Sequence, residues 1–157
     1  PLAVGIICGQ TTAEFREFET DLKARVDKAG CSNRIIFLGT QPSDRLPPLF
    51  AALDIYVAPQ RNEGFGLTPL EAMASGVPVI ATTAGAFEEM VLNGETGYIV
   101  EIEDIVNMTK KLNELLSNDT KRRALAKAST ERVSQHFDIK GEAAALVKLY
   151  QDLLSKT

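Results

Sequence analysis

The sequence predicts an α/β fold in which helices flank a parallel sheet. Along residues 1–100, short apolar runs alternate with segments of helical periodicity, which is the pattern of α/β proteins. The apolar runs mostly lack strict apolar-polar alternation, as expected for strands that are buried on both faces. After residue 100 the pattern becomes wholly helical. The sheet is therefore expected in the first part of the chain, and helices in the last.

Apolar runs of strand length occur at 2–8, 35–38, 55–58, 77–81 and 98–100. We expect them to form five parallel strands. Between the first two strands, apolar residues recur at helical spacing: Phe15, Phe18, Leu22 and Val26. Thr11, with Glu14 three residues later, matches a capping box, and Gly30 marks the end of a helix. The sequence therefore predicts a helix between Thr11 and Gly30.

Shorter connecting helices are predicted near 49–53, 69–75 and 86–92. Residues 102–157 form a predicted helical segment with apolar residues at helical spacing. These residues are Ile105, Met108, Leu112, Leu115 and Leu116, then Leu125, Ala128 and Val133, then Val147, Tyr150, Leu153 and Leu154.

Length and composition restrict the class of protein. A chain of 157 residues predicts one domain, 1–157, with one core. Hydrophobic residues make up 45% and charged residues 24% of the chain, as in globular proteins, and the net charge of -4 disfavours nucleic acid as a partner. Cys8 and Cys31 are too few for a disulfide framework. We expect both to be reduced thiols, as in a cytoplasmic protein. No apolar run approaches the roughly 20 residues of a membrane-spanning helix, so we expect a soluble protein.

The most informative segment is 62–76, NEGFGLTPLEAMASG, which follows the third predicted strand. Thr68, Pro69 and Glu71 match the N-cap, the first and the third residue of a helix, directly after a glycine loop. Free N–H groups and the positive end of the helix dipole make such a helix start an anion site, most often for phosphate. In parallel sheets, ligands bind at the carboxyl ends of strands.

Local physics leaves simpler interpretations open for three residues of this segment. Glu71 can serve only as the acid of a capping box. Glu63 lies in a predicted loop and can be a solvated charge. Phe65, between two glycines, can be a hydrophobic plug.

Glu63 and Glu71, read with GFGL and EAMASGVPVI, resemble the E-x7-E signature of retaining GT-B glycosyltransferases of glycosyltransferase family 4, the glycosyl transferases group 1. The likeness continues at NRIIFLG, LFAALDIYVAP, TTAGAFEEMVLNGETGYIV and VKLYQDLL, and so covers nearly the whole chain in order. In this family the region is the donor-binding lobe, a Rossmann-like domain that faces an acceptor lobe across a cleft.

The resemblance implies a set of donor-binding residues: Gly39, Thr40, Gln41, Gly64, Phe65, Gly66, Leu67, Thr68, Glu71 and Gly85. It implies the catalytic position for Glu63, whose carboxylate would hydrogen-bond hydroxyls of the transferred sugar. Leu67 and Thr68 would present N–H groups to the diphosphate. Glu71 would accept hydrogen bonds from both ribose hydroxyls, which its two oxygens suit.

Further roles follow from the same resemblance. The backbone of residues 65–66 would line the sugar and its phosphate, and residues 39–41 would pass beside the base. Gly85 would stay small for access of the sugar, although a plain turn explains this glycine equally well. We expect Glu63 and Glu71 to face one shared cavity.

The family's lobe begins one β-α unit earlier than this chain, and that unit carries an Arg and a Lys that bind the diphosphate. The absent strand is central in the family order, so strands 2–8 and 55–58 are expected to flank an unpaired slot. A strand of a longer parent protein or another copy of the chain would fill this slot, or the two halves of the sheet would close directly. No Lys or Arg occurs from residue 62 to 109. Arg34, Arg45 and Arg61 are the nearest candidates for cations, or are solvated surface charges.

The resemblance implies an enzyme that transfers a hexose from a nucleoside-diphosphate sugar to an acceptor hydroxyl, in bacterial envelope polysaccharide or lipopolysaccharide synthesis. GDP-mannose is weakly favoured as donor. Acceptor sugar or lipid would bind the other lobe, so we expect this chain alone to be inactive. No cofactor is expected, and no metal, because no DxD pair occurs. The parent enzyme is expected in the cytoplasm, with peripheral contact to the inner face of the membrane.

Two other functions are compatible with the same scaffold. One is a non-catalytic binding or assembly module, against which the intact pair of Glu63 and Glu71 argues. The other is a sugar-nucleotide enzyme such as an epimerase, which product analysis with and without acceptor would distinguish.

Overall fold

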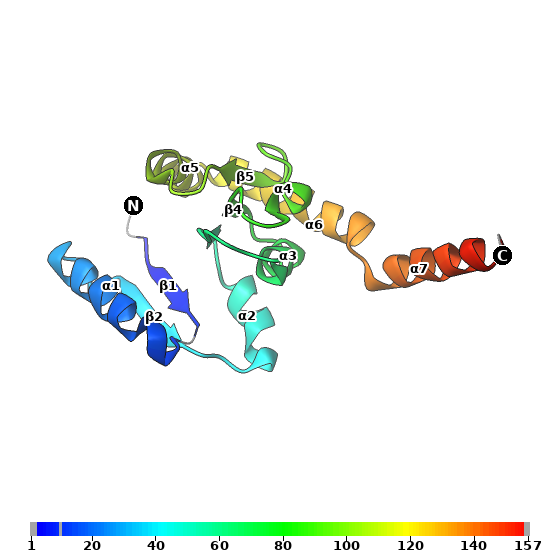
Figure 1. Cartoon of the computed structure of the whole chain (residues 1–157). Coiled ribbons are helices and arrows are strands. Elements are labelled where there is room, and N and C mark those ends of the chain that lie inside the picture. The colour runs from blue at the N-terminus through cyan, green and yellow to red at the C-terminus, as the bar shows by residue number, and fades with distance from the viewer. Residues whose placement is uncertain (1–2, 10, 156–157) are drawn as a thin grey trace. The chain divides into compact units, whose positions relative to one another are not determined.

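The computed structural model describes residues 3–9 and 11–155 (Figure 1). Leu2, the first residue of the first predicted strand, lies outside these residues. The chain divides into two compact units, Pro1–Pro47 and Pro48–Thr157. All five predicted strands are confirmed, and parallel sheets with flanking helices make the fold α/β.

The first unit is a β-α-β element. Strand β1 (Gly5–Cys8) pairs in parallel with β2 (Ile35–Gly39), and the register shifts between Ile7 and Cys8. Between the strands lie a short 3-10 turn, η1 (Ala13–Phe15), and helix α1 (Arg16–Lys28). A second 3-10 turn, η2 (Ser43–Arg45), follows β2.

The predicted end of α1 is confirmed, but its predicted start is wrong. Gly30 adopts φ +67° directly after the C-cap residue, a conformation that glycine tolerates. Glu14 lies in the 3-10 turn, so the α-helix begins only at Arg16, and no threonine side chain caps either helix. The predicted apolar face is also largely solvent-exposed: Phe15 and Phe18 are 56% and 66% exposed.

The second unit contains a three-stranded parallel sheet in the order β3 (Tyr56–Ala58), β4 (Val79–Thr82), β5 (Gly97–Val100). Helix α2 (Leu46–Ala51) precedes β3. Helix α3 (Leu67–Ala74) joins β3 to β4, and the short helix α4 (Phe87–Met90) joins β4 to β5. Every residue of the central strand β4 is buried, which explains the continuous apolar run at residues 77–81.

Strands β1 and β3, which the sequence predicts to flank an unpaired slot, are both edge strands. In the described part of the chain, β1 pairs only with β2, and β3 pairs only with β4. The strands therefore form two sheets instead of one continuous sheet, and the two strands that the sequence predicts to be unpaired on one side are among the edge strands.

Two long helices complete the core of the second unit. Helices α5 (Ile105–Ser117) and α6 (Asp119–His136) pack against the sheet, and Ile80, Tyr98, Leu115 and Leu125 form a buried cluster. Helix α6 also packs against α3, where the Thr130 hydroxyl donates to the Met73 carbonyl over 3.0 Å. Helix α6 thus fixes the C-terminal end of α3.

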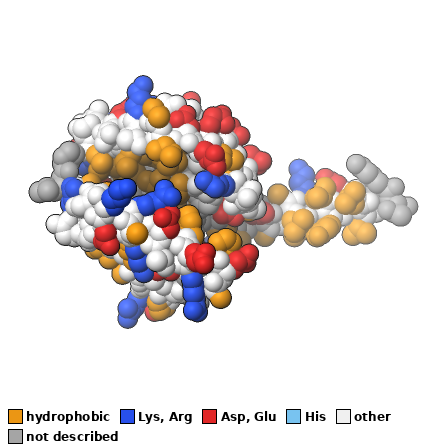
Figure 2. Space-filling model, turned by 60° about the vertical axis from the view of Figure 1, so that its left-hand side comes forward, with side chains coloured by type: hydrophobic (Ala, Val, Ile, Leu, Met, Phe, Trp, Pro, Cys, Tyr) orange, Lys and Arg blue, Asp and Glu red, His pale blue; other side chains and the backbone are white. Residues whose placement is uncertain are grey.

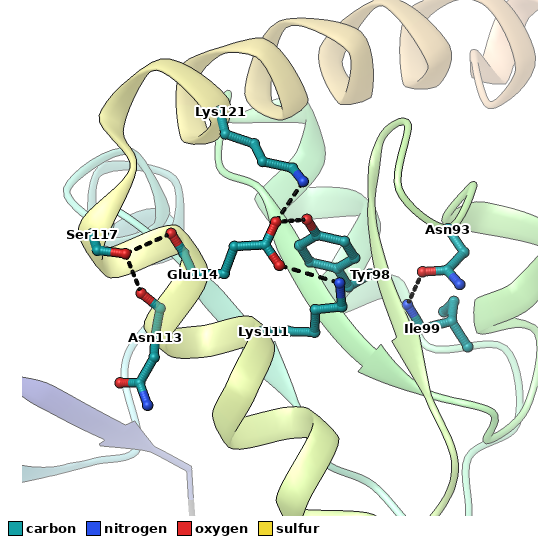
Figure 3. A network of polar contacts seen from close by, with 8 residues as sticks. All are labelled: Asn93, Tyr98, Ile99, Lys111, Asn113, Glu114, Ser117 and Lys121. Atoms are coloured by element: carbon teal, nitrogen blue, oxygen red, sulfur yellow. Dashed lines mark hydrogen bonds and ion pairs between the residues drawn. The ribbon is translucent and has the colours of Figure 1, made fainter.

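A polar network covers the rim of this core (Figure 3). The Tyr98 hydroxyl donates to Glu114 over 2.6 Å, and both Lys111 and Lys121 form ion pairs with the same carboxylate. The Lys111 ammonium also lies 4.0 Å from the centre of the Tyr98 ring. Hydrogen bonds from Lys121 and then Tyr98 lower the pKa of Glu114 to about 2.

This pKa predicts a pH-dependent contribution to stability. Because the folded-state pKa is below the ordinary value of 4.5, Glu114 stabilises the fold above pH 4.5, and this contribution is lost as the pH falls through about 2. Replacement of Glu114 by Gln should lower the melting temperature at pH 7 by roughly 2–4 °C. Thermal denaturation at several pH values should show this difference shrinking towards pH 2. Glu131→Gln, which removes an exposed ion pair to Lys127, should leave the melting temperature unchanged at all pH values.

Helix α7 (Ile139–Leu154) ends the described chain. The Asp138 carboxylate accepts from the Gly141 N–H and caps its start. None of its residues is buried, and Figure 2 shows apolar side chains along it. Among residues 3–9 and 11–155, the structure has no helix long and apolar enough to cross a membrane.

Candidate functional site

Helix α3 begins at Leu67, one residue before the predicted N-cap Thr68. Gly66 is the N-cap instead, with φ +84° and ψ +78°, a left-handed conformation that glycine adopts without steric cost. The capping box predicted from Thr68, Pro69 and Glu71 is therefore wrong, because Glu71 is the fifth residue of the helix. The left-handed glycine turns the chain into the helix earlier than the cap motif predicts.

The start of α3 leaves backbone donors without a side-chain cap. The N–H groups of the first residues of a helix have no partner within it. Pro69, the third residue, has no N–H, so Leu67 and Thr68 carry the donors of this turn. Both residues are exposed. An anion site formed by these two N–H groups and the helix dipole stays a prediction.

Glu71 lies on the exposed face of the same helix. The residues on the opposite face, Pro69, Leu70, Ala72 and Met73, are buried. Glu71 follows Leu67 by four residues and Thr68 by three, so these three residues share one face. A ligand phosphate at the helix start and a hydroxyl-bearing group beside Glu71 would lie along one surface.

Glu63 lies in the loop before the helix, and its carboxylate accepts a hydrogen bond from the Gly64 N–H over 2.9 Å. A Cβ added at Gly66 would lie 3.0 Å from the Cγ of Glu63. The Glu63 side chain therefore folds towards the glycine that starts α3. Glu63 and the neighbouring Phe65 are both exposed, the latter by 51%, so Phe65 is not a buried plug.

Gly85 fixes the backbone of this loop. Its φ is +57°, and an added Cβ would lie 2.7 Å from the Gly64 carbonyl oxygen and 2.8 Å from that of Glu63. The close approach of two backbone segments therefore explains this glycine without a sugar. Access of a sugar at Gly85 stays a prediction.

Two further contacts hold the segment between β3 and Glu63. The buried Thr82 hydroxyl donates to the Gln60 carbonyl over 2.6 Å at the end of β4. Arg61 forms an ion pair with Glu103 over 3.1 Å. Of the three candidate cations for a diphosphate, Arg61 therefore already has a carboxylate partner.

Gly39, Thr40 and Gln41 belong to the first unit, at the end of β2. Gly39 has φ +67°, and the Gln41 side-chain amide donates to the Leu38 carbonyl over 3.0 Å. These residues form a tight turn after the strand, where the resemblance predicts contact with the base. Gly39 also borders a small cavity of about 210 Å³ between β1, β2 and α1.

A larger cavity of about 570 Å³ lies in the second unit beside β5 and the start of α5. Its acidic lining residues are Glu88, Glu101 and Asp104. Hydrogen bonds from the backbone and then the side chain of Asn107 lower the pKa of Asp104. Neither this cavity nor the smaller one is lined by Glu63 or Glu71. Both glutamates are exposed, and the shared cavity expected for them stays a prediction.

The sequence does not reveal which buried residues support the loop before α3. Phe87 is completely buried and its ring borders Gly66, while Thr82 binds the backbone of Gln60. The aromatic residue two positions after Gly85 is the signal in the sequence, but only the tertiary structure connects it to Gly66.

Comparison with known proteins relates these features to a family. The model of the family described as glycosyl transferases group 1 matches residues 3–132. The chain is 43% identical over 151 residues to the lipopolysaccharide core biosynthesis mannosyltransferase LpsB of Rhizobium meliloti (strain 1021). This match covers 95% of the chain but only 42% of the relative.

Solved structures of similar proteins identify the fold. The C-terminal domain of a glycosyl transferase group 1 family protein, LpcC of Francisella tularensis, is 36% identical, with a TM-score of 0.82 over 87% of this chain and 70% of that one. Anabaena Alr3699/HepE, solved in complex with UDP, is 26% identical, with a TM-score of 0.87 over 100% of this chain and 42% of that one. The fold matches that of GT-B C-terminal domains.

Proposed function

We propose that this chain, which belongs to the glycosyl transferases group 1 family, is the nucleotide-sugar-binding domain of a retaining hexosyltransferase. The observation that carries the proposal is the start of α3. There the uncapped N–H groups of Leu67 and Thr68 are flanked in the sequence by two exposed carboxylates, Glu63 in the loop and Glu71 on the helix. This arrangement suits an elongated ligand with a diphosphate in its middle and hydroxyl groups at both ends.

In this proposal, a different glutamate carboxylate accepts hydrogen bonds at each end of the donor molecule. Glu71 accepts hydrogen bonds from the ribose hydroxyls, and Glu63 accepts them from the transferred sugar. Leu67 and Thr68 donate to the diphosphate, the backbone of residues 64–66 lines the sugar, and the turn at 39–41 contacts the base.

The departing diphosphate needs more positive charge than α3 provides. A helix start contributes about half a unit charge and roughly 0.3–1 kcal/mol per nearby anion. Two carboxylates flank this start, and Arg61 is already paired with Glu103. We therefore propose that cations from another part of a longer enzyme complete the site. The chain spans 42% of the length of its mannosyltransferase relative, which leaves room for such a part.

Transfer with retention of configuration would rely on positioning and charge stabilisation by this domain. Glu63 orients the sugar for attack by the acceptor on its front face, while the helix N–H groups and the added cations stabilise the leaving diphosphate. Glu63 and Glu71 would not act as a hydrolase pair, because Glu71 is needed at the nucleotide.

The name of the mannosyltransferase relative favours a mannose donor and lipopolysaccharide as the product, whereas the UDP complex of the structural neighbour favours a uridine nucleotide. We propose a bacterial envelope glycan or lipid as the acceptor, bound by another lobe. The reaction would take place in the cytoplasm, with peripheral contact of the whole enzyme to the membrane.

Calorimetric titration of the 157-residue chain with GDP-mannose and UDP-glucose tests the proposal. We expect weak, saturable binding of one of them and no release of sugar, because the acceptor lobe and the further cations are absent. Free mannose and glucose serve as controls and should not bind. Failure of every nucleotide sugar to bind would refute donor binding, and turnover by this chain alone would refute the need for a second lobe.

A further inference from the structure

We infer that Phe87 is a positioning residue for Glu63, and that Arg132 keeps the helix of Phe87 in place. The inference rests on the proposed function of the glycine loop. Glu63 is exposed, and the hydrogen bond to its carboxylate comes from the adjacent residue, Gly64. The position of this carboxylate therefore depends on what supports the backbone of the loop.

The Phe87 ring provides support beside Gly66. Phe87 has no solvent-exposed surface, and its ring occupies the space where a Cβ of Gly66 would lie. That Cβ would be 3.1 Å from the Cζ of Phe87 and 3.0 Å from the Cγ of Glu63. The ring and the Glu63 side chain therefore border the same point in the loop. Loss of the ring would leave a hole directly beneath the residue that turns the chain into α3.

A second contact from the same segment supports the loop at its other end. Gly85 packs against the carbonyl groups of Glu63 and Gly64. Residues 85–87 thus touch the loop both at Glu63 and at Gly66. The placement of α4, which begins at Phe87, consequently determines the placement of the loop.

Helix α4 has four residues, so its own hydrogen bonds hold it weakly. Arg132 of α6 compensates for this. Its Nε donates to the Met90 carbonyl over 2.8 Å, and its Nη2 donates to the Glu89 carbonyl over 2.6 Å. A charged donor at the C-terminal carbonyls of a helix is favourable both as a hydrogen bond and through the helix dipole. Arg132 therefore fixes α4, and α4 fixes the loop through Phe87.

The same helix α6 also holds the far end of α3 through Thr130 and the Met73 carbonyl. Both elements that meet at Gly66, the loop and α3, are thus anchored on α6. A shift of about 1 Å in a group that orients a substrate can cost roughly 100-fold in rate. Phe87 and Arg132 contact no part of a bound donor in this account, and they act only through the loop.

Hydrogen–deuterium exchange of the full 157-residue chain without ligand tests the inference. In Phe87→Ala, the amides of residues 70–72, which form the first hydrogen-bonded turn of α3 after Gly66, should exchange at least 10-fold faster than in the wild type. Arg132→Ala should accelerate the same amides by a smaller factor. Leu115→Ala, which leaves a cavity in the buried cluster between the sheet and α5, is the matched control. When each variant is measured the same number of degrees below its own melting temperature, Leu115→Ala should leave the exchange rates of these amides unchanged. Equal acceleration in Leu115→Ala would reduce Phe87 to a general core residue and overturn the inference.

A milder variant and the absence of ligand make the exchange experiment decisive. If Phe87→Ala does not fold, Phe87→Leu should show the same pattern with a smaller factor, and unchanged exchange in Phe87→Leu would then contradict the inference. The exchange experiment contains no ligand, so its result does not depend on donor binding. If the wild-type chain binds no nucleotide sugar, the proposed function fails while the support of the loop by Phe87 is still decided.

Discussion

Replacement of Gly85 by Ala should weaken the binding of nucleotide sugars by about 100-fold. The added Cβ would lie 2.7 and 2.8 Å from the carbonyl oxygens of Gly64 and Glu63, and backbone atoms cannot rotate away as a flexible side chain can. The loop must therefore move, and with it the Glu63 carboxylate and the start of α3. Calorimetric titration with the nucleotide sugar that the wild-type chain binds measures the loss.

A matched control separates this clash from backbone strain. Gly94 also has a positive φ, +83°, but an added Cβ there meets nothing within 4 Å. Both Gly85→Ala and Gly94→Ala carry the strain of a left-handed alanine, which is about 1–2 kcal/mol. Both should therefore lower the melting temperature, whereas only Gly85→Ala should lose binding. Normal binding by Gly85→Ala would show that the loop is not part of the donor site.

Replacement of Glu71 by Ala should weaken binding of the nucleoside diphosphate alone by about 10- to 100-fold, since hydrogen bonds to a charged group contribute roughly 1.5–3 kcal/mol. Glu71 is exposed on α3, opposite the buried residues of that helix, so the substitution should not change the melting temperature. Glu95→Ala removes another exposed carboxylate, from the loop before β5, and is the control for a general change in charge.

Glu63→Ala provides the contrast. Because Glu63 is assigned to the sugar, this variant should bind the nucleoside diphosphate nearly as well as the wild type. In the longer enzyme it should chiefly lower turnover. Stronger loss of nucleotide binding in Glu63→Ala than in Glu71→Ala would reverse the two roles.

The strands could be predicted from the sequence because their signal is local. The apolar runs at 35–38, 55–58 and 77–81 correspond to β2, β3 and β4 within a few residues. Burial of β4 on both faces favours the continuous apolar run at residues 77–81, which can be recognised without knowledge of the neighbouring strands. Gly30 likewise marked the end of α1, because a positive φ at a helix end favours glycine wherever the helix lies.

The helix starts were predicted less well. At α3, the residues Thr68, Pro69 and Glu71 match a cap motif, but Gly66 turns the chain into the helix before the motif begins. That turn is stabilised by Phe87, which lies 21 positions later in the sequence. A motif read from neighbouring residues contains no information about such a contact.

The same limit applies to the candidate site. The two glutamates and the N–H donors of α3 could be found from their spacing, because they lie within one loop and one helix. The reason for Gly85, the pairing of Arg61 with Glu103 and the anchoring of α4 by Arg132 depend on contacts between distant segments. Sequence patterns therefore locate the residues that would touch a ligand better than the residues that hold them.

The most direct test is a titration of the isotope-labelled chain with UDP and with GDP. NMR monitors the chemical shifts of the backbone amides during each titration. Binding of the diphosphate at the start of α3 predicts that Leu67 and Thr68 show the largest saturable shifts with one of the two nucleotides. If these two amides stay unchanged while amides elsewhere shift, for example around the cavity beside β5, the nucleotide binds at another place and the account is wrong.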